Sequence, residues 1–283
     1  MEERKADYSE ISEVYDAART NDRPHMEWWL KRLAEVGGLE PGKLLLDLGC
    51  GTGRWTNLLV ERTGCDAVGV DSSEEMLVKA RAKDRSGRIA WLQGDVYRPP
   101  VEAQRFDAAL MSLLLHHLED PYVAFRAAYV ALKPGGVLMI RQGTLDQIID
   151  DPAHRFFPET IGLELKRTPL PIEVERLLAK AGFTEVSAEA VRLRTHHSPE
   201  DWLLEVVPRV CSIFRLISDE AFAHGQAALK EYIAAHPDDP WLLEESMTLF
   251  SARRAAGLKA IIGTGTVIME VSETQYLPAF LRC

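Results

Sequence analysis

The chain has 283 residues, of which 46% are hydrophobic and 27% are charged. A chain of this length can bury a large core, and this composition excludes a disordered chain, a collagen and a coiled coil. The 43 acidic residues outnumber the 33 basic ones, which gives a net charge of -10. Proteins that bind nucleic-acid backbones generally need the opposite sign, so nucleic acid is not an expected partner.

The cysteines and the first residues indicate where the protein resides. Cys50, Cys65, Cys211 and Cys283 form no CxxC pair, and no Cys/His cluster has zinc spacing, so we expect no metal. The first ten residues are polar and lack an apolar signal core, and no apolar run approaches the roughly 20 residues that cross a bilayer. These features predict a cytoplasmic protein without a membrane span.

The first part of the chain is predicted to be helical. A helical pattern from Ser9 to Trp29 is interrupted near Arg23-Pro24, and a second helix continues to Val36 and stops at Gly37-Gly38. Beyond it, short apolar runs typical of strands alternate with helical patterns. The predicted strands are 43–48, 67–70, 88–93, 106–112, 137–141 and 184–193. The predicted helices are 55–62, 74–83 with Ser73 as its N-cap, 122–132 and 172–181.

Alternating strands and helices predict an α/β fold, in which a mostly parallel sheet is covered on both faces. Right-handed crossovers place the carboxyl ends of the strands at one edge, where ligands bind in sheets of this kind. The stretch 198–257 is strongly helical in pattern, with Ser198 as the candidate N-cap, and strand character returns over Thr264 to Val271. We therefore expect a helical block to interrupt the sheet before its last strand.

The residues richest in chemical information follow the first predicted strand. Gly49, Gly51 and Gly53 stand at alternate positions before a helix, where glycine permits positive φ and a close approach of ligand to backbone. The dinucleotide pattern GxGxxG would need glycine where Arg54 stands. Asp71 ends the next strand about 20 residues later, the separation expected of an acid that binds a ribose. The alternative is that the glycines only form a tight turn and Asp71 only caps a helix.

Five segments, in this order, resemble the motifs of the class I S-adenosylmethionine (SAM)-dependent methyltransferases. They are LLLDLGCGTGRWT (44–56), VGVDSSEEMLVKAR (68–81), LQGDVYRPP (92–100), FDAALMSLLLHHLEDP (106–121) and ALKPGGVLMI (131–140). The resemblance is strongest to small-molecule methyltransferases of the ubiquinone-biosynthesis type. It implies a Rossmann-like, mostly parallel seven-stranded sheet with helices on both faces and a helical cap insertion before the last strand.

The resemblance also implies that SAM is the cofactor and S-adenosylhomocysteine its product, and it assigns roles to single residues. The methionine moiety would lie against Gly49, Cys50 and Gly51, in the loop that continues through Thr52 and Gly53, while Asp47 would anchor this loop near the amino group. Asp71 would accept both ribose hydroxyls, and Ser72 and Met76 would flank the adenine. Asp95 would take the adenine amino group, with Gly94 and Val96 beside it, and Ser112 and Leu113 would lie under the cofactor. Core packing is the alternative for Met76, and a turn cap is the alternative for Asp95.

Two further sets of residues are candidates for catalysis and closure. His116 and His117 follow the fourth strand, near the expected position of the methyl group, and a histidine there would suit a general base. The alternative is that they are only part of the fold. In the N-terminal helix, Tyr8, Tyr15, Arg19 or Arg23 would close over the cofactor as a lid, or else belong to an ordinary amphipathic helix.

The predicted organisation is an N-terminal helical lid (1–36), a SAM-binding core (37–197), a helical cap (198–258) and the last strand with a tail (259–283). The leading hypothesis is an enzyme that methylates a small-molecule acceptor, which the acidic balance predicts to be neutral, apolar or cationic. The alternative is a SAM-binding regulatory or partner protein without catalysis. A nicotinamide dehydrogenase is disfavoured by Arg54 and by the motif set.

Overall fold

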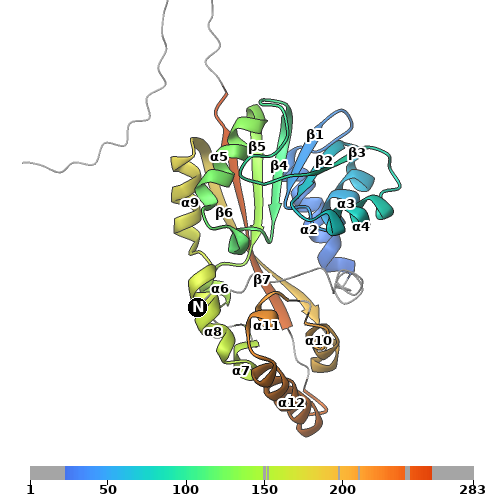
Figure 1. Cartoon of the computed structure of the whole chain (residues 1–283), viewed down its shortest axis with the longest axis vertical. Helices are drawn as coiled ribbons and strands as arrows, with labels where there is room; N and C mark the ends of the chain where they lie inside the picture. Colours follow the sequence, from blue (N-terminus) through green and yellow to red (C-terminus); the bar gives the residue numbers. More distant parts are fainter. Residues whose placement is uncertain are drawn as a thin grey trace, which may run out of the picture.

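Seven strands form one sheet in the order β3-β2-β1-β4-β5-β7-β6 in the computed structural model, which describes residues 23–148, 151, 153–196, 198–209, 211–239 and 243–256 (Figure 1). The strands are β1 (Leu44–Leu48), β2 (Asp66–Asp71), β3 (Ile89–Gln93), β4 (Phe106–Ser112), β5 (Leu132–Gln142), β6 (Phe183–His196) and β7 (Leu243–Arg254). The first five strands are parallel to one another, whereas β7 runs antiparallel to both β5 and β6. The predicted parallel sheet and its strands are therefore confirmed up to β6.

Helices cover both faces of the sheet (Figure 1). One face carries α2 (Arg23–Gly37), α3 (Arg54–Thr63) and α4 (Glu74–Lys83), and the other carries α5 (Pro121–Ala131) and α9 (Pro171–Lys180). Two of the helices in the structure begin at caps that the sequence predicted. Ser73 accepts a hydrogen bond from the N–H of Met76 at 3.3 Å, and Ser198 accepts one from the N–H of Asp201 at 3.2 Å. These bonds satisfy donors that a helix start leaves open.

The central strands are mostly apolar because both of their faces are buried. In β4, Ala108 and Leu110 pack toward α2 and α3, whereas Ala109 and Met111 belong to the core beneath α5 and α9. All four side chains are fully buried. Alternating orientation with burial on both sides is the expected pattern for a central parallel strand.

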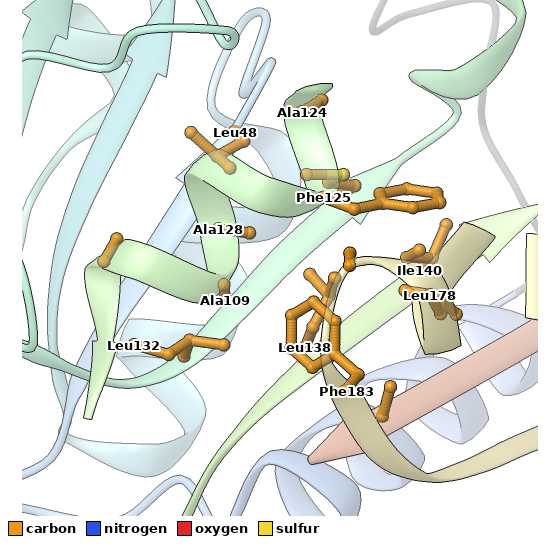
Figure 2. Close-up of a cluster of buried hydrophobic side chains, with 14 of the residues drawn as sticks. Leu48, Ala109, Ala124, Phe125, Ala128, Leu132, Leu138, Ile140, Leu178 and Phe183 are labelled. Carbon is orange, nitrogen blue, oxygen red and sulfur yellow. The ribbon is translucent and has the colours of Figure 1, made fainter. Parts of the chain in front are cut away.

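The core beneath α5 and α9 joins the middle of the sheet to both helices. Phe125 and Ala128 of α5 lie against Leu138 and Ile140 of β5, and Leu178 of α9 packs beside them (Figure 2). All five residues are fully buried. This packing holds the end of β5, which enters the site described below, in a fixed position.

A second helical layer lies beyond the carboxyl ends of the parallel strands (Figure 1). Between β5 and α9 the chain forms α6 (Leu145–Ile148), α7 (Ala153–Phe156) and α8 (Glu159–Arg167); between β6 and β7 it forms α10 (Pro199–Val206), α11 (Ile213–Leu216) and α12 (Asp219–Ala235). The sequence predicted helices only in the second of these segments. Both contribute to one aromatic core, in which the ring centroid of Phe157 lies 4.7 Å from that of Phe214 and 5.6 Å from that of Phe222.

The expectation of helix throughout 198–257 was wrong for residues 243–254, which form β7. This segment pairs with β5 on one side and β6 on the other, so its backbone hydrogen bonds are satisfied as a strand. Its side chains also alternate: Leu249 joins the core on the α2 face, and Phe250 the core beneath α5. The strand expected at Thr264 to Val271 lies outside the described residues, as do residues 1–22 of the predicted lid. Among the helices described, none is long and apolar enough to cross a membrane.

We predict that alanine substitutions at two helical glycines have opposite effects on the free energy of unfolding. A Cβ on Gly225 of α12 would lie 2.3 Å from Cδ1 of Phe157 and 2.6 Å from the backbone oxygen of Phe156. Because that core is tightly packed, Gly225→Ala should lower the free energy of unfolding by about 1–3 kcal/mol.

The matched control is Gly162→Ala in α8, where a Cβ would meet nothing within 4 Å. Alanine favours a helix over glycine by about 1 kcal/mol, so this variant should be as stable as the parent or slightly more stable. Urea unfolding of both variants measures the two changes. Shifts of the same sign and size would contradict the packing described for α12.

Candidate functional site

The loop between β1 and α3 depends on three glycines. Gly49, Gly51 and Gly53 have φ of 71°, 53° and 69°, in the left-handed region that favours glycine. A Cβ on Gly49 would lie 2.7 Å from Leu114, and one on Gly53 would lie 2.4 Å from Trp91, whereas one on Gly51 would meet nothing within 4 Å. Gly51 therefore borders open space, and a ligand can approach the backbone there.

Asp71 joins the end of β2 to this glycine loop. Its Oδ2 accepts the N–H of Gly51 at 2.8 Å, and its Oδ1 accepts the N–H of Ser73 at 2.9 Å. Each carboxylate oxygen has further lone-pair capacity beyond one such bond. The carboxylate is thus held in place by the backbone and can still accept hydrogen bonds from a ligand.

Asp47 lies in β1, buried beneath the same loop. Burial raises the pKa of its carboxyl group to about 7; the hydrogen bond from the Thr56 hydroxyl, at 2.5 Å, opposes this shift, and the charge of Asp71 adds to it. Burial and the same two acids also raise the pKa of the Cys50 thiol, which therefore stays protonated. This end of the site accordingly favours a cationic group and offers no thiolate nucleophile.

A cavity of about 2640 Å³ extends from the glycine loop, across the carboxyl ends of the strands, to the second helical layer. Most of the cofactor-binding residues predicted from the sequence line it: Asp47, Gly49, Cys50, Gly51, Thr52, Asp71, Ser72, Met76, Asp95, Val96, Ser112 and Leu113. Gly53 and Gly94 are not in its wall. They instead allow close packing, since a Cβ on Gly53 would collide with Trp91 and one on Gly94 with Pro100.

On the side of the cavity expected to hold adenine, Met76 and Asp95 each show features of both a binding residue and a purely structural one. Met76 lines the cavity and is also 8% exposed, as a core residue would be. Asp95 lines the cavity and caps a turn, because its Oδ1 accepts the N–H of Tyr97 at 2.9 Å. Neither observation excludes a role in binding, so both assignments stay predictions.

The end of β4 forms the floor of the cavity. Leu113 has φ of 54°, which is uncommon for a residue with a side chain, and its N–H donates to the backbone oxygen of Arg141 at 2.8 Å. The hydroxyl oxygen of Ser112 is buried at this floor and has no hydrogen-bond partner among the residues that the structure describes. Strained backbone and an unsatisfied polar atom often occur together where a ligand binds.

His116 and His117 form the short 3-10 turn η1 (Leu115–His117) and both line the cavity. His117 is exposed at the cavity wall, where the surrounding protein removes part of its hydration. This partial desolvation and the charge of Arg167 lower the pKa of His117 to about 4, so that its ring is neutral at physiological pH and a weak base. His116 lies with Nδ1 at 3.1 Å from the amide nitrogen of Gln142. The predicted role of either ring as a general base stays a prediction.

The predicted lid residues cannot be placed at the cavity. Tyr8, Tyr15 and Arg19 lie outside the described residues, and Arg23 is the first residue of α2, with a side chain that is not described.

Sequence reasoning missed a charged cluster behind the floor. The guanidinium of Arg141, at the end of β5, lies 4.8 Å from the ring centroid of Trp29 and 5.0 Å from that of Trp55. It donates to Oε2 of Glu245 at 2.8 Å, and the same oxygen is 2.7 Å from Nε2 of His25. Because a helix was expected at 243–254, the position of Glu245 next to Arg141 could not be predicted. An arginine that ends an apolar strand at the ligand-binding edge was the available signal for Arg141.

The end of the cavity nearest the second helical layer carries carboxylates and an aromatic ring. Glu164 of α8 accepts the Thr168 hydroxyl at 2.5 Å, and Glu205 of α10 lies 2.9 Å from Nε2 of His196. Trp202 of α10 lines the same region. The cavity thus continues well beyond the glycine loop into a region with room for a second molecule.

Comparison with known proteins gives this site a context. Residues 46–140 match the family described as a methyltransferase domain, and this range runs from β1 into β5. The demethylmenaquinone methyltransferase of Lactococcus lactis subsp. lactis is 35% identical over 136 residues, which cover 46% of this chain and 54% of the relative. The trans-aconitate 2-methyltransferase of Azoarcus sp. is 37% identical over 155 residues, which cover 54% of this chain and 59% of the relative. The chain thus spans rather more than half the length of these two curated relatives.

Solved structures extend the likeness to most of the chain. A putative methyltransferase from an antibiotic biosynthesis pathway of Anabaena variabilis has a TM-score of 0.69 at 18% identity, over 83% of this chain and 98% of that one. At this identity the likeness shows a shared fold. The predicted Rossmann-like fold of class I methyltransferases, with a seven-stranded, mostly parallel sheet, is confirmed.

We predict that Asp47 makes the free energy of unfolding depend on pH. The carboxyl group ionises near pH 3.8 when unfolded and near pH 7 when folded, so the folded protein holds the extra proton between these values. Stability should therefore fall as the pH rises through this window. Asp47→Asn keeps an oxygen for Thr56 and removes this loss, which amounts to about 4 kcal/mol at most.

Thermal unfolding of the parent and of Asp47→Asn at about pH 5 and about pH 8 measures the effect. The variant's advantage should grow with pH, whereas a constant difference would contradict the raised pKa of Asp47. Asp66→Asn is a suitable control, because the Asp66 side chain is 55% exposed at the start of β2.

Proposed function

We propose that the protein transfers a methyl group from SAM to a small-molecule acceptor, on the premise that residues 46–140 match a methyltransferase domain and lie within a sheet of the class I type. The observation that carries the proposal is the continuity of the cavity. It joins the glycine loop and Asp71 to the end of the cavity lined by Glu164, Trp202 and Glu205, which we call the second chamber. Methyl donor and acceptor need to meet in such a space.

The residues at the glycine loop suit SAM. Gly51 leaves room at the backbone, and the anchored carboxylate of Asp71 has capacity for the two ribose hydroxyls. Asp47 and Asp71 place negative charge where the cationic methionine end would lie, and the buried Ser112 hydroxyl offers an unsatisfied polar group. When bound, SAM supplies a methyl group activated by a positively charged sulfur.

The work left to the protein is binding, orientation and exclusion of water. In-line displacement needs the acceptor atom, the methyl group and the sulfur in one line, and holding them so contributes several kcal/mol to lowering the barrier. The floor formed by Ser112 and Leu113, with His116 beside it, lines this same cavity and is the place where the reacting atoms would meet. The α8 and α10 helices form the wall against which the acceptor would rest.

The acceptor that we propose is neutral, apolar or cationic. The curated relatives act, by their names, on demethylmenaquinone and trans-aconitate, which differ in size and charge, so they do not select an acceptor class. In this chain, Glu164, Glu205 and Trp202 line the second chamber and can hold a ring or a basic group, although Arg167 and Arg192 lie in the same wall. The preference over a polyanion rests on the net charge of -10.

Methyl transfer itself is tested with SAM carrying a labelled methyl group, added to the protein in a cell extract. We expect label in a small-molecule product, formed only with active protein. Binding of SAM without any labelled product, in extracts of several origins, would contradict catalysis and favour a SAM-binding regulatory protein.

We predict that Asp71→Ala raises the dissociation constant for SAM by about 10- to 100-fold, because it removes two charge-assisted hydrogen bonds to the ribose. Isothermal titration calorimetry measures the constant. Asp66→Ala serves as the control, since Asp66 is at the other end of β2, exposed and 3.6 Å from Arg88.

The control variant should bind SAM as the parent does. Thermal unfolding of Asp71→Ala verifies that the loss of bonds to Gly51 and Ser73 leaves the protein folded at the temperature of the titration. SAM binding in the micromolar range by a folded Asp71→Ala, equal to that of the parent, would rule out the proposed ribose contact.

A further inference from the structure

The side chain of Gln142 occupies a buried position directly behind His116. Gln142 is the last residue of β5 and is only 2% exposed. Its Oε1 lies 3.2 Å from the backbone nitrogen of Leu115, and its Nε2 lies 3.1 Å from Nδ1 of His116 and 3.3 Å from the backbone oxygen of Gly143. The amide is therefore held from three sides at the floor of the cavity.

Two of these neighbours determine which way the amide faces. The backbone N–H of Leu115 can only donate, so the atom opposite it is the amide oxygen; the backbone oxygen of Gly143 can only accept, so the atom opposite it is the amide nitrogen. Rotating the amide by half a turn would put N–H against N–H and oxygen against oxygen. The assignment of the amide thus follows from the hydrogen-bond network and does not depend on the histidine.

The amide in turn determines the protonation of the histidine ring. Its nitrogen carries only N–H groups, so Nδ1 of His116 accepts a hydrogen bond and holds no proton. In a neutral imidazole the proton is then on Nε2. A second proton on Nδ1 would face the N–H of Gln142 and lose this bond.

We propose that Gln142 is a positioning residue that holds His116 as the neutral tautomer protonated on Nε2, so that Nε2 can only donate a hydrogen bond and His116 is not the general base. The consequence for the acceptor rests on the proposed methyl transfer. An N–H at Nε2 attracts an oxygen atom and orients its carrier, but cannot take up a proton from it. The reacting atom of the acceptor then either carries no proton or loses its proton to a group other than His116, or to water.

The tautomer can be measured without turnover, in protein labelled with ¹⁵N-histidine. Long-range proton–nitrogen correlation spectra distinguish a protonated ring nitrogen from an unprotonated one, and a His116→Asn variant identifies the signals of His116. For the parent protein we expect Nε2 protonated and Nδ1 unprotonated, with a preference of about tenfold from the single fixed hydrogen bond.

Gln142→Glu provides the decisive substitution, because a carboxylate can only accept. Its oxygen would attract a proton to Nδ1, so His116 should change to the Nδ1-protonated tautomer or to the imidazolium form. Gln147→Glu is the matched control: it makes the same change in the same cavity wall, but Oε1 of Gln147 accepts from the Thr144 hydroxyl at 3.0 Å. That variant should keep the parent's tautomer.

A parent protein with its proton on Nδ1 would overturn the proposal, and so would a folded Gln142→Glu that keeps the Nε2 tautomer. If Gln142→Glu does not fold, Gln142→Met replaces it, since methionine has no N–H to donate; the strong preference should then fall to a mixture of tautomers, and an unchanged preference would count against Gln142. These spectra need neither SAM nor acceptor. A failure of this proposal is therefore distinct from a failure of the methyltransferase function, which the SAM titration and labelling test separately.

Discussion

The parallel pairing of the central strands is the constraint on which the site depends. β1 pairs with β2 and β4, and β4 with β5, in registers that place Leu48 opposite Val70 and Ser112 opposite Arg141. Because the strands run in the same direction, the residues that follow them meet at one edge although they are far apart in the sequence. The glycine loop, Asp71, His116 and Gln142 come together only for this reason. A slip of one residue in any pair would turn the strand's side chains to the opposite face.

Electrostatic tension is concentrated at the same edge. Burial is the main reason why the pKa of Asp47 is raised, and the charge of the nearby Asp71 adds to it, so the folded protein without a ligand disfavours an ionised carboxylate at Asp47. The hydrogen bonds from Thr56 to Asp47, and from Gly51 and Ser73 to Asp71, stabilise the two carboxylates but do not neutralise their charge. A cationic ligand would relieve the tension, so the same feature that costs stability favours binding of the proposed cofactor.

The other side of the floor is held by packing and by a partly buried ion pair. Arg141 lies between two tryptophans and pairs with Glu245, which ties the end of β5 to β7 and to α2. Such a pair contributes little net stability once its desolvation is counted, but it defines one arrangement of the groups that make it. Gln142 follows Arg141 in the chain, so its backbone is held in the same position. Its amide can then stabilise a single tautomer of His116. The packing on both faces of the sheet thus also fixes the positions of the polar atoms that line the cavity.

The sequence by itself determined the α/β class, the strands from β1 to β6, the caps at Ser73 and Ser198, and the identity of the residues at the glycine loop and Asp71. These features are local: apolar runs, capping side chains and glycines each have a physical reason within a few residues. Only the tertiary structure decided the state of residues 243–254, because two neighbouring strands, distant in the sequence, supply their hydrogen bonds. It also decided that α7 and α8 join α10 to α12 around one aromatic core, and that Arg141, Gln142 and Glu245 adjoin the site. Their significance comes from partners far away in the chain, Trp29, His116 and His25 among them, and no local pattern carries that information.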